Sequence, residues 1–128
     1  MKLINILFAF SLVGLVIVTN SCRKEDGPFG RGDIYGTVTF ENGATGHEDK
    51  AAMAIIKISY GIKEPSAEFD QMYLSFSDGS YSIKGLAPGD YYLTAEYTDR
   101  FNYKYSHPGY GITIRSKKSS VNINFLLK

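Results

Sequence analysis

The sequence predicts an all-β domain, a seven-stranded antiparallel β-sandwich that an N-terminal signal-peptide helix precedes. Seven short runs alternate between apolar and polar residues with a period of two, which is the spacing of half-buried strands. Gly, Pro and Asp stand between most of these runs, and no long helical pattern follows residue 32. With 128 residues and an apolar fraction of 44%, the chain has room for one domain with a packed core.

The first three runs occupy residues 33–40, 54–60 and 72–77. In the first two, every second residue is apolar or glycine, so one face of each strand can be buried while the other stays polar. Their predicted inward residues are Ile34, Gly36, Val38, Phe40, Ala54, Ile56, Ile58 and Tyr60. The third run, MYLSFS, is predicted to be a short strand.

The remaining four runs occupy residues 80–85, 90–97, 111–115 and 121–128. Their predicted inward residues are Tyr81, Ile83, Tyr91, Leu93, Ala95, Tyr97, Val121, Ile123, Phe125 and Leu127. Gly79, after Asp78, supplies the positive φ of a tight hairpin. The Pro-Gly pairs at 88–89 and 108–109 stand at the second and third positions of predicted type II turns.

Residues 77–97, SDGSYSIKGLAPGDYYLTAEY, resemble the core signature of the carboxypeptidase regulatory-like domain, which is related to transthyretin-like and Cna-B-type sandwiches. The matching residues are Asp78, Gly79, Tyr81, Ile83, Gly85, Leu86, Pro88, Gly89, Tyr91 and Leu93, with Gly36 and Val38 in the opening strand. The resemblance covers residues 33–128 and implies a sandwich without catalytic function. The Cna-B-type isopeptide bond requires an inward lysine on the first strand, and residues 33–40 contain none.

The first 21 residues resemble a lipoprotein signal peptide. Lys2 precedes an apolar run over residues 6–18, which is shorter than the roughly 20 residues that a spanning helix needs. VTNSC at 18–22 resembles a lipobox of the Bacteroidota type, which implies cleavage before Cys22 and a covalent lipid on its sulfur. That lipid is the only cofactor expected, and the alternative is an uncleaved membrane anchor with an incidental cysteine.

Residues 22–32 are charged and then rich in Gly and Pro, which predicts a flexible tether between the lipid and the domain. The four charged residues at 23–26 resemble an export signal, so we expect an outer-membrane protein that can also face the cell surface. Without the signal peptide the chain carries 13 basic and 13 acidic side chains, which disfavours nucleic-acid binding.

Residues 97–111, YTDRFNYKYSHPGYG, form the most suggestive candidate surface. Aromatic faces beside polar groups suit a sugar ring or a protein hot spot. The candidate binding residues are Arg100, Phe101, Tyr103, Tyr105, His107 and Tyr110. The alternative is that these aromatics alternate because they extend a strand with one buried face. Two functions therefore stay open, a non-catalytic accessory or protein-interaction module and a glycan-binding surface lipoprotein.

Other motifs carry little weight. His47-Glu48-Asp49 could bind a cation, but a solvated loop is the better explanation, so no metal site is predicted. Ser119 and Ser120 have no evident base partner, and no catalytic residue is predicted. The integrin-type tripeptide at 31–33 leads directly into the first strand. We therefore predict that the protein is not an enzyme.

Overall fold

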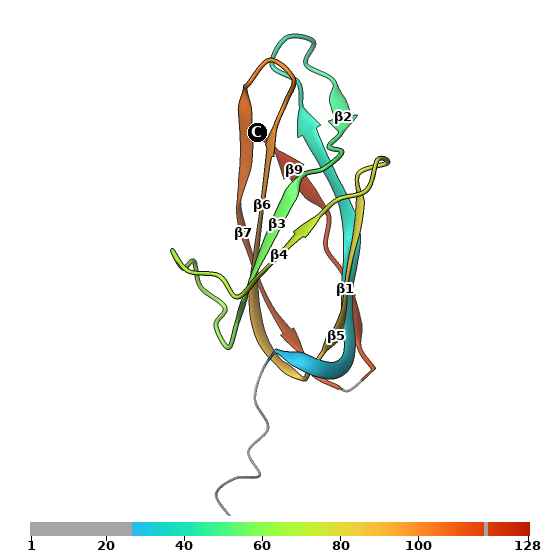
Figure 1. Cartoon of the computed structure of the whole chain (residues 1–128), viewed down its shortest axis with the longest axis vertical. Coiled ribbons are helices and arrows are strands. Elements are labelled where there is room, and N and C mark those ends of the chain that lie inside the picture. The colour runs from blue at the N-terminus through green and yellow to red at the C-terminus, as the bar shows by residue number, and fades with distance from the viewer. Residues whose placement is uncertain (1–26, 117) are drawn as a thin grey trace, which may run out of the picture.

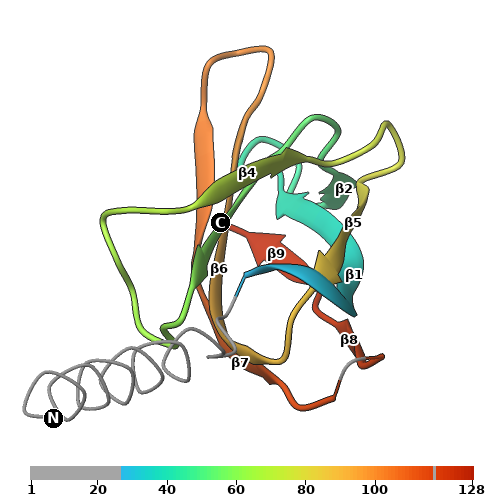
Figure 2. The same ribbon diagram turned by 60° about the horizontal axis from the view of Figure 1, so that its bottom comes forward.

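The computed structural model describes residues 27–116 and 118–128, and all regular structure in them is β (Figures 1 and 2). The strands are β1 (Pro28–Glu41), β2 (Glu48–Lys50), β3 (Ile55–Tyr60), β4 (Gln71–Leu74), β5 (Ser80–Leu86), β6 (Gly89–Thr98), β7 (Lys104–Ile114), β8 (Ser120–Asn122) and β9 (Phe125–Leu127). The predicted all-β sandwich is confirmed. The signal peptide, Cys22 and the tether as far as residue 26 lie outside the described residues. No helix in the described ranges is long and apolar enough to cross a membrane.

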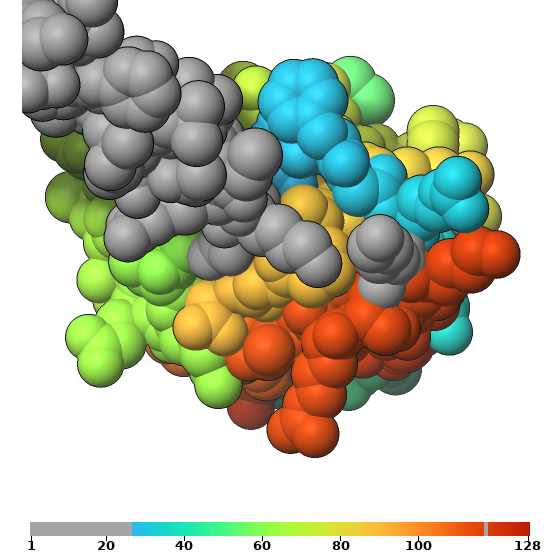
Figure 3. All heavy atoms as spheres, turned by 90° about the horizontal axis from the view of Figure 1, so that it is seen from below, coloured from blue at the N-terminus to red at the C-terminus, as the bar shows by residue number. Residues whose placement is uncertain are grey.

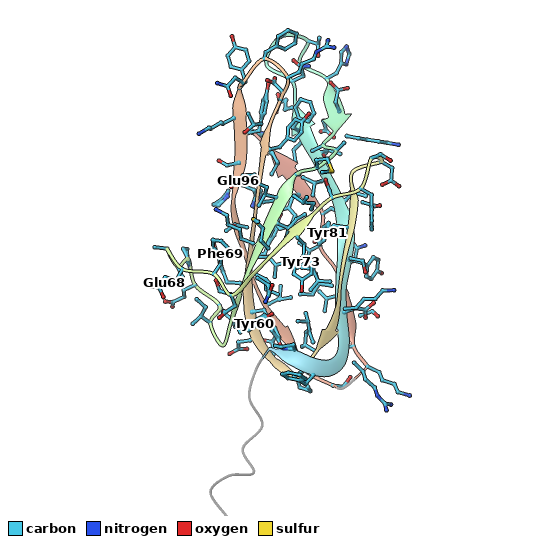
Figure 4. The ribbon with its side chains drawn as sticks, viewed as in Figure 1. Tyr60, Glu68, Phe69, Tyr73, Tyr81 and Glu96 are labelled. Carbon is cyan, nitrogen blue, oxygen red and sulfur yellow. The ribbon has the colours of Figure 1, made fainter. Side chains whose placement is uncertain are left out.

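The first sheet is built around β1. β5 and β2 pair with it antiparallel, whereas β8 and β9 pair with it in parallel, so β1 is bonded along both of its edges. The second sheet has the order β4-β3-β6-β7 and is antiparallel throughout. Tyr73 and Tyr81 lie between the two sheets (Figure 4).

The predicted strand at 121–128 is divided into β8 and β9, and its expected antiparallel pairing is wrong. The chain crosses from β7 in one sheet to β8 in the other, so it returns in the same direction as β1. The break falls at Asn124, whose Oδ1 accepts the backbone N–H of Thr37 at 3.0 Å in place of a ladder bond. β2 is a further strand that the sequence pattern did not indicate.

The predicted inward faces form the core. All of the predicted inward residues are buried except Tyr60, Tyr97 and Val121, which are half-buried and pack against it. Ser59 and Tyr92 were expected to face solvent, but each is only 7% exposed. The loop after β3 covers this part of the outer face, where the Ser59 hydroxyl donates to the carbonyl of Glu68 at 2.9 Å.

β1 begins at Pro28, earlier than the predicted start at residue 33. The hydroxyl of the buried Tyr91 accepts the N–H of Gly27 at 2.9 Å, and the Gly27 carbonyl accepts the N–H of Ala87 at 2.8 Å. These bonds fix the entry of the chain against the β5–β6 turn, at the end of the sandwich seen in Figure 3. The tripeptide at 31–33 is therefore part of a strand, and Asp33 accepts a hydrogen bond from the Ser120 hydroxyl at 2.6 Å.

The predicted turn at 107–110 is wrong, because these residues form a bulge inside β7. Leu93 and Ala95 of β6 lie opposite Tyr110 and His107, so β7 contains one extra residue. Gly109 has a φ of 108°, and its N–H donates to Nδ1 of His107 at 2.8 Å. A proline is tolerated here because a bulge interrupts the ladder.

The strand register predicts a contrast between neighbouring residues of β6. Leu93 is fully buried and Thr94 lies on the outer face, half-exposed. Leu93→Ala should lower the free energy of unfolding by about 2–5 kcal/mol. Thr94→Ala should lower it by less than about 1 kcal/mol. Equal costs in urea denaturation would show that the register is displaced by one residue.

The bulge predicts that acid destabilises the domain through His107. Burial lowers the pKa of His107 from its ordinary value of 6.5, and its Nδ1 must be unprotonated to accept the Gly109 N–H. This contribution to stability is present above pH 6.5, the unfolded-state pKa, and is lost as the pH falls through the lower folded-state pKa. As the pH is lowered through this interval, the melting temperature of the parent should fall more steeply than that of His107→Asn, whose side chain keeps an acceptor but does not titrate. The same slope in both proteins would contradict the assignment.

Candidate functional site

The β6–β7 hairpin lies at the end of the sandwich opposite the chain entry (Figure 1). The carboxylate of Asp99 organises its turn, since Oδ1 accepts the N–H groups of Phe101 and Tyr103, each at 2.9 Å. Asn102 adopts a left-handed φ of 67°, and its N–H bonds to the carbonyl of Asp99. A fourth hydrogen bond runs from the Asp99 N–H to the Tyr103 carbonyl at 3.0 Å, so one aspartate holds the turn in place rather than leaving it as a loose loop.

This turn displays two aromatic rings to solvent. Phe101 is 68% exposed and Tyr103 is 66% exposed. The guanidinium of Arg100 lies 4.9 Å from the centroid of the Phe101 ring, within the range of a cation–π contact. Three of the six candidate binding residues thus share the tip of the hairpin.

Tyr105 has a different environment from Tyr103. It is only 9% exposed, and its ring centroid lies 4.9 Å from that of Phe40 and 6.4 Å from that of Tyr97. Tyr105 is therefore a core residue, as expected for every second position of a strand with one buried face.

His107 and Tyr110 lie further along β7, away from the tip. Their rings stack at 4.6 Å, and each lies 5.4 Å from the ring of Phe125 in β9. They close the seam between β7 and β9, although Tyr110 remains 39% exposed. The structure thus distributes the six candidate residues over the tip, the core and this seam.

A cleft of about 450 Å³ lies at the base of the same hairpin. Thr98 and Lys104, which flank the turn, pair with each other and line the cleft. The described residues that line the cleft are Met53, Ile55, Glu96, Tyr97, Thr98, Lys104, Tyr105 and Ser106. A carboxylate, an ammonium group, two aliphatic hydroxyls and two tyrosines beside aliphatic and thioether surface can bind a ligand that carries both hydroxyls and an apolar face.

An exposed apolar row, which the sequence pattern did not identify as a surface, runs along β4 and continues past its end to Phe76. Met72, Leu74 and Phe76 are 52%, 48% and 62% exposed. Leu74 pairs with Ile55, and Ile55 pairs with Glu96, so the row is adjacent to the cleft. The alternation of Met, Leu and Phe in MYLSFS was the available signal, and only the edge position of β4 shows that this face stays open.

The other motifs do not assemble a site among the described residues. Residues 27–116 and 118–128 contain no group of three or more His, Cys, Asp and Glu side chains placed to bind a metal ion. Asp49 lies in the exposed strand β2 and accepts a long hydrogen bond from the Asn42 amide at 3.4 Å. Ser119 bonds to Ser116.

Comparisons with known proteins agree with the fold. No protein-family model matches the chain, and no curated protein matches its sequence. GBS52, the minor pilin of Streptococcus agalactiae, matches in structure with a TM-score of 0.54 at 18% identity, over 78% of this chain and 45% of the pilin. A variant of BcpA, the major pilin subunit of Bacillus cereus, matches with a TM-score of 0.52 at 17% identity, over 77% of this chain and 30% of that one.

The chain spans less than half the length of either pilin. At these identities the likeness shows the fold alone. It is a β-sandwich of the kind found in pilins, which is compatible with a Cna-B-type or transthyretin-like domain.

Proposed function

We propose that the protein is a non-catalytic lipoprotein of the outer membrane, anchored through Cys22, whose β6–β7 hairpin binds a protein partner. The observation that carries the proposal is the exposure of Phe101 and Tyr103 on a turn that Asp99 already holds in place. Exposed aromatics on a preorganised turn gain their burial on binding and lose little conformational entropy.

The placement of the two ends supports this role. The chain enters the domain at Gly27, and the hairpin turn lies at the far end of the sandwich (Figure 1). A lipid on Cys22 would therefore leave the hairpin directed away from the bilayer. The likeness to pilin subunits supports a structural or interaction role rather than a catalytic one.

A glycan-binding surface lipoprotein is the second candidate, and the cleft favours it. Glu96, Lys104 and Ser106 offer a carboxylate, an ammonium group and a hydroxyl within one hollow, next to the exposed rings of the turn. Glu96 is also positioned by an ion pair with Lys57 at 3.3 Å. Sugar hydroxyls and the apolar face of a sugar ring match this combination.

The anchor is tested by replacing Cys22. In cells given a fatty-acid analogue, Cys22→Ala should lose all label and accumulate as a slower-migrating precursor, because the Cys22 sulfur is the atom that carries the lipid. The wild-type chain expressed in parallel is the control. Label that persists on the variant would overturn the lipoprotein assignment.

The hairpin is tested with Phe101→Ala and Tyr103→Ala combined. Because both rings are exposed, the melting temperature should stay close to that of the parent. Cross-linking and pull-down from the native membrane should capture the parent's partner at least about tenfold less well, as for loss of a hot spot. Phe76→Ala, which removes an equally exposed ring outside the hairpin, should leave capture unchanged.

A glycan array separates the two candidates. Binding of a defined oligosaccharide that Glu96→Gln abolishes would favour the glycan-binding function. Undiminished protein capture by the Phe101→Ala/Tyr103→Ala variant would place the partner surface elsewhere and refute the hairpin proposal.

A further inference from the structure

We infer that the basal end of the domain, where the chain enters, rests directly on an anionic lipid bilayer, with the ring of Phe29 inserted among the headgroups. The basal end comprises residues 27–33, the β5–β6 turn and the described residues between β7 and β8, which are 115–116 and 118–119 (Figure 3). The inference rests on the proposed anchor at Cys22 and adds a second, non-covalent contact that would orient the domain.

Phe29 is the most exposed large apolar side chain of the described residues. It is 99% exposed, and its φ of 79° lies in the left-handed region, which bulky side chains rarely adopt. The domain therefore gains no burial from this ring and has a strained backbone beneath it. Strain retained without a packing benefit is typical of a residue that acts on something outside the fold.

The surrounding backbone fixes the ring in this position. Pro28 and Gly32 both lie opposite Leu86 of β5, so the intervening residues form an irregularity in the pairing. Gly30 is pressed against the β5–β6 turn, since an added Cβ would lie 2.1 Å from the Leu86 carbonyl oxygen. With Gly30 held inward, its neighbours Phe29 and Arg31 are exposed.

The exposed charges at the basal end are positive. Arg31, Arg115 and Lys118 are exposed, whereas the two basal carboxylates, Asp33 and Asp90, are half-buried. Each carboxylate also accepts a hydrogen bond from a hydroxyl, at 2.6 Å from Ser120 and 2.7 Å from Thr113. The neighbouring loop, residues 61–70, adds one exposed cation, Lys63, and three exposed carboxylates, Glu64, Glu68 and Asp70. Asp70 accepts the N–H of Tyr60 at 2.7 Å, and Glu68 projects from the side of the sandwich (Figure 4).

An apolar ring flanked by cations is suited to the surface of an anionic bilayer. Near such a surface each Lys or Arg contributes on its own only weakly, and the attraction falls off within a Debye length. Phe29 is the seventh residue after Cys22, so a lipid on that sulfur keeps the basal end within about 25 Å of the bilayer. At that effective concentration a weak contact is sufficient.

The test uses two properties of the sequence, its single cysteine and its lack of tryptophan. The mature chain, residues 22–128, is coupled at Cys22 to a maleimide lipid and placed in phosphatidylethanolamine–phosphatidylglycerol vesicles with brominated acyl chains. The single indole of Phe29→Trp should lose emission relative to vesicles without bromine, and its emission maximum should shift to the blue relative to the same protein free in solution. Phe101→Trp, at the far end of the sandwich, should show neither change. An unquenched indole at position 29 would overturn the inference.

Three further variants test the charges and the strain. In the Phe29→Trp background, Arg31→Glu with Lys118→Glu should restore emission, whereas Lys104→Glu at the hairpin should not. Phe29→Gly should melt no lower than the parent, because it removes the ring and relaxes the left-handed backbone. A lower melting temperature would mean that the ring stabilises the fold, contrary to the inference.

Chemical coupling separates this inference from the proposed anchor. Quenching of the coupled protein does not depend on whether cells acylate Cys22. Fatty-acid label that persists on Cys22→Ala in cells, together with quenching of the coupled protein, would refute the anchor alone. Label that Cys22→Ala loses, without quenching of the coupled protein, would refute the basal contact alone.

Discussion

The double pairing of β1 is the constraint on which the rest of the structure depends. Because β5 and β2 occupy one edge and β8 and β9 the other, the first described strand is bonded directly to the last two. The arrangement requires Gly36, since an added Cβ would lie 1.8 Å from the carbonyl oxygen of Ile123. Asn124 then bonds to Thr37 where the closing segment changes from one strand to the next. The second sheet packs on the inner face that these contacts define.

Alternation in the sequence predicted the inner faces well, because a period of two leaves few ways to bury Ile34, Leu93 or Phe125. It failed where tertiary contacts decide the outcome. A Pro-Gly pair has the same local chemistry in a turn and in a bulge, and only the pairing with β6 distinguishes them at 108–109. Likewise, Tyr92 is buried by segments distant in sequence, which no local pattern reports.

The candidate site was predictable as a segment but not as a surface. Alternate aromatics at Tyr103 and Tyr105 look equivalent in the sequence, yet one is presented to solvent and the other packs against Phe40. Asp99 decides this by holding the turn through its side chain, and nothing in the composition of the segment singles it out. The open row on β4 was missed because exposure of an edge strand is a property of the sheet order.

The hydrogen bond between the Tyr91 hydroxyl and the backbone of Gly27 has a mechanical consequence. This bond lies at the entry of the chain, and β6 then runs from Gly89 to Thr98, about 33 Å, as far as the hairpin turn. Tension between the entry and the hairpin tip would therefore run along the axis of β6. The ladders to β3 and β7 would be loaded in shear, with many hydrogen bonds sharing the force at once instead of opening one after another. A domain built in this way is suited to remain folded while something pulls on its tip.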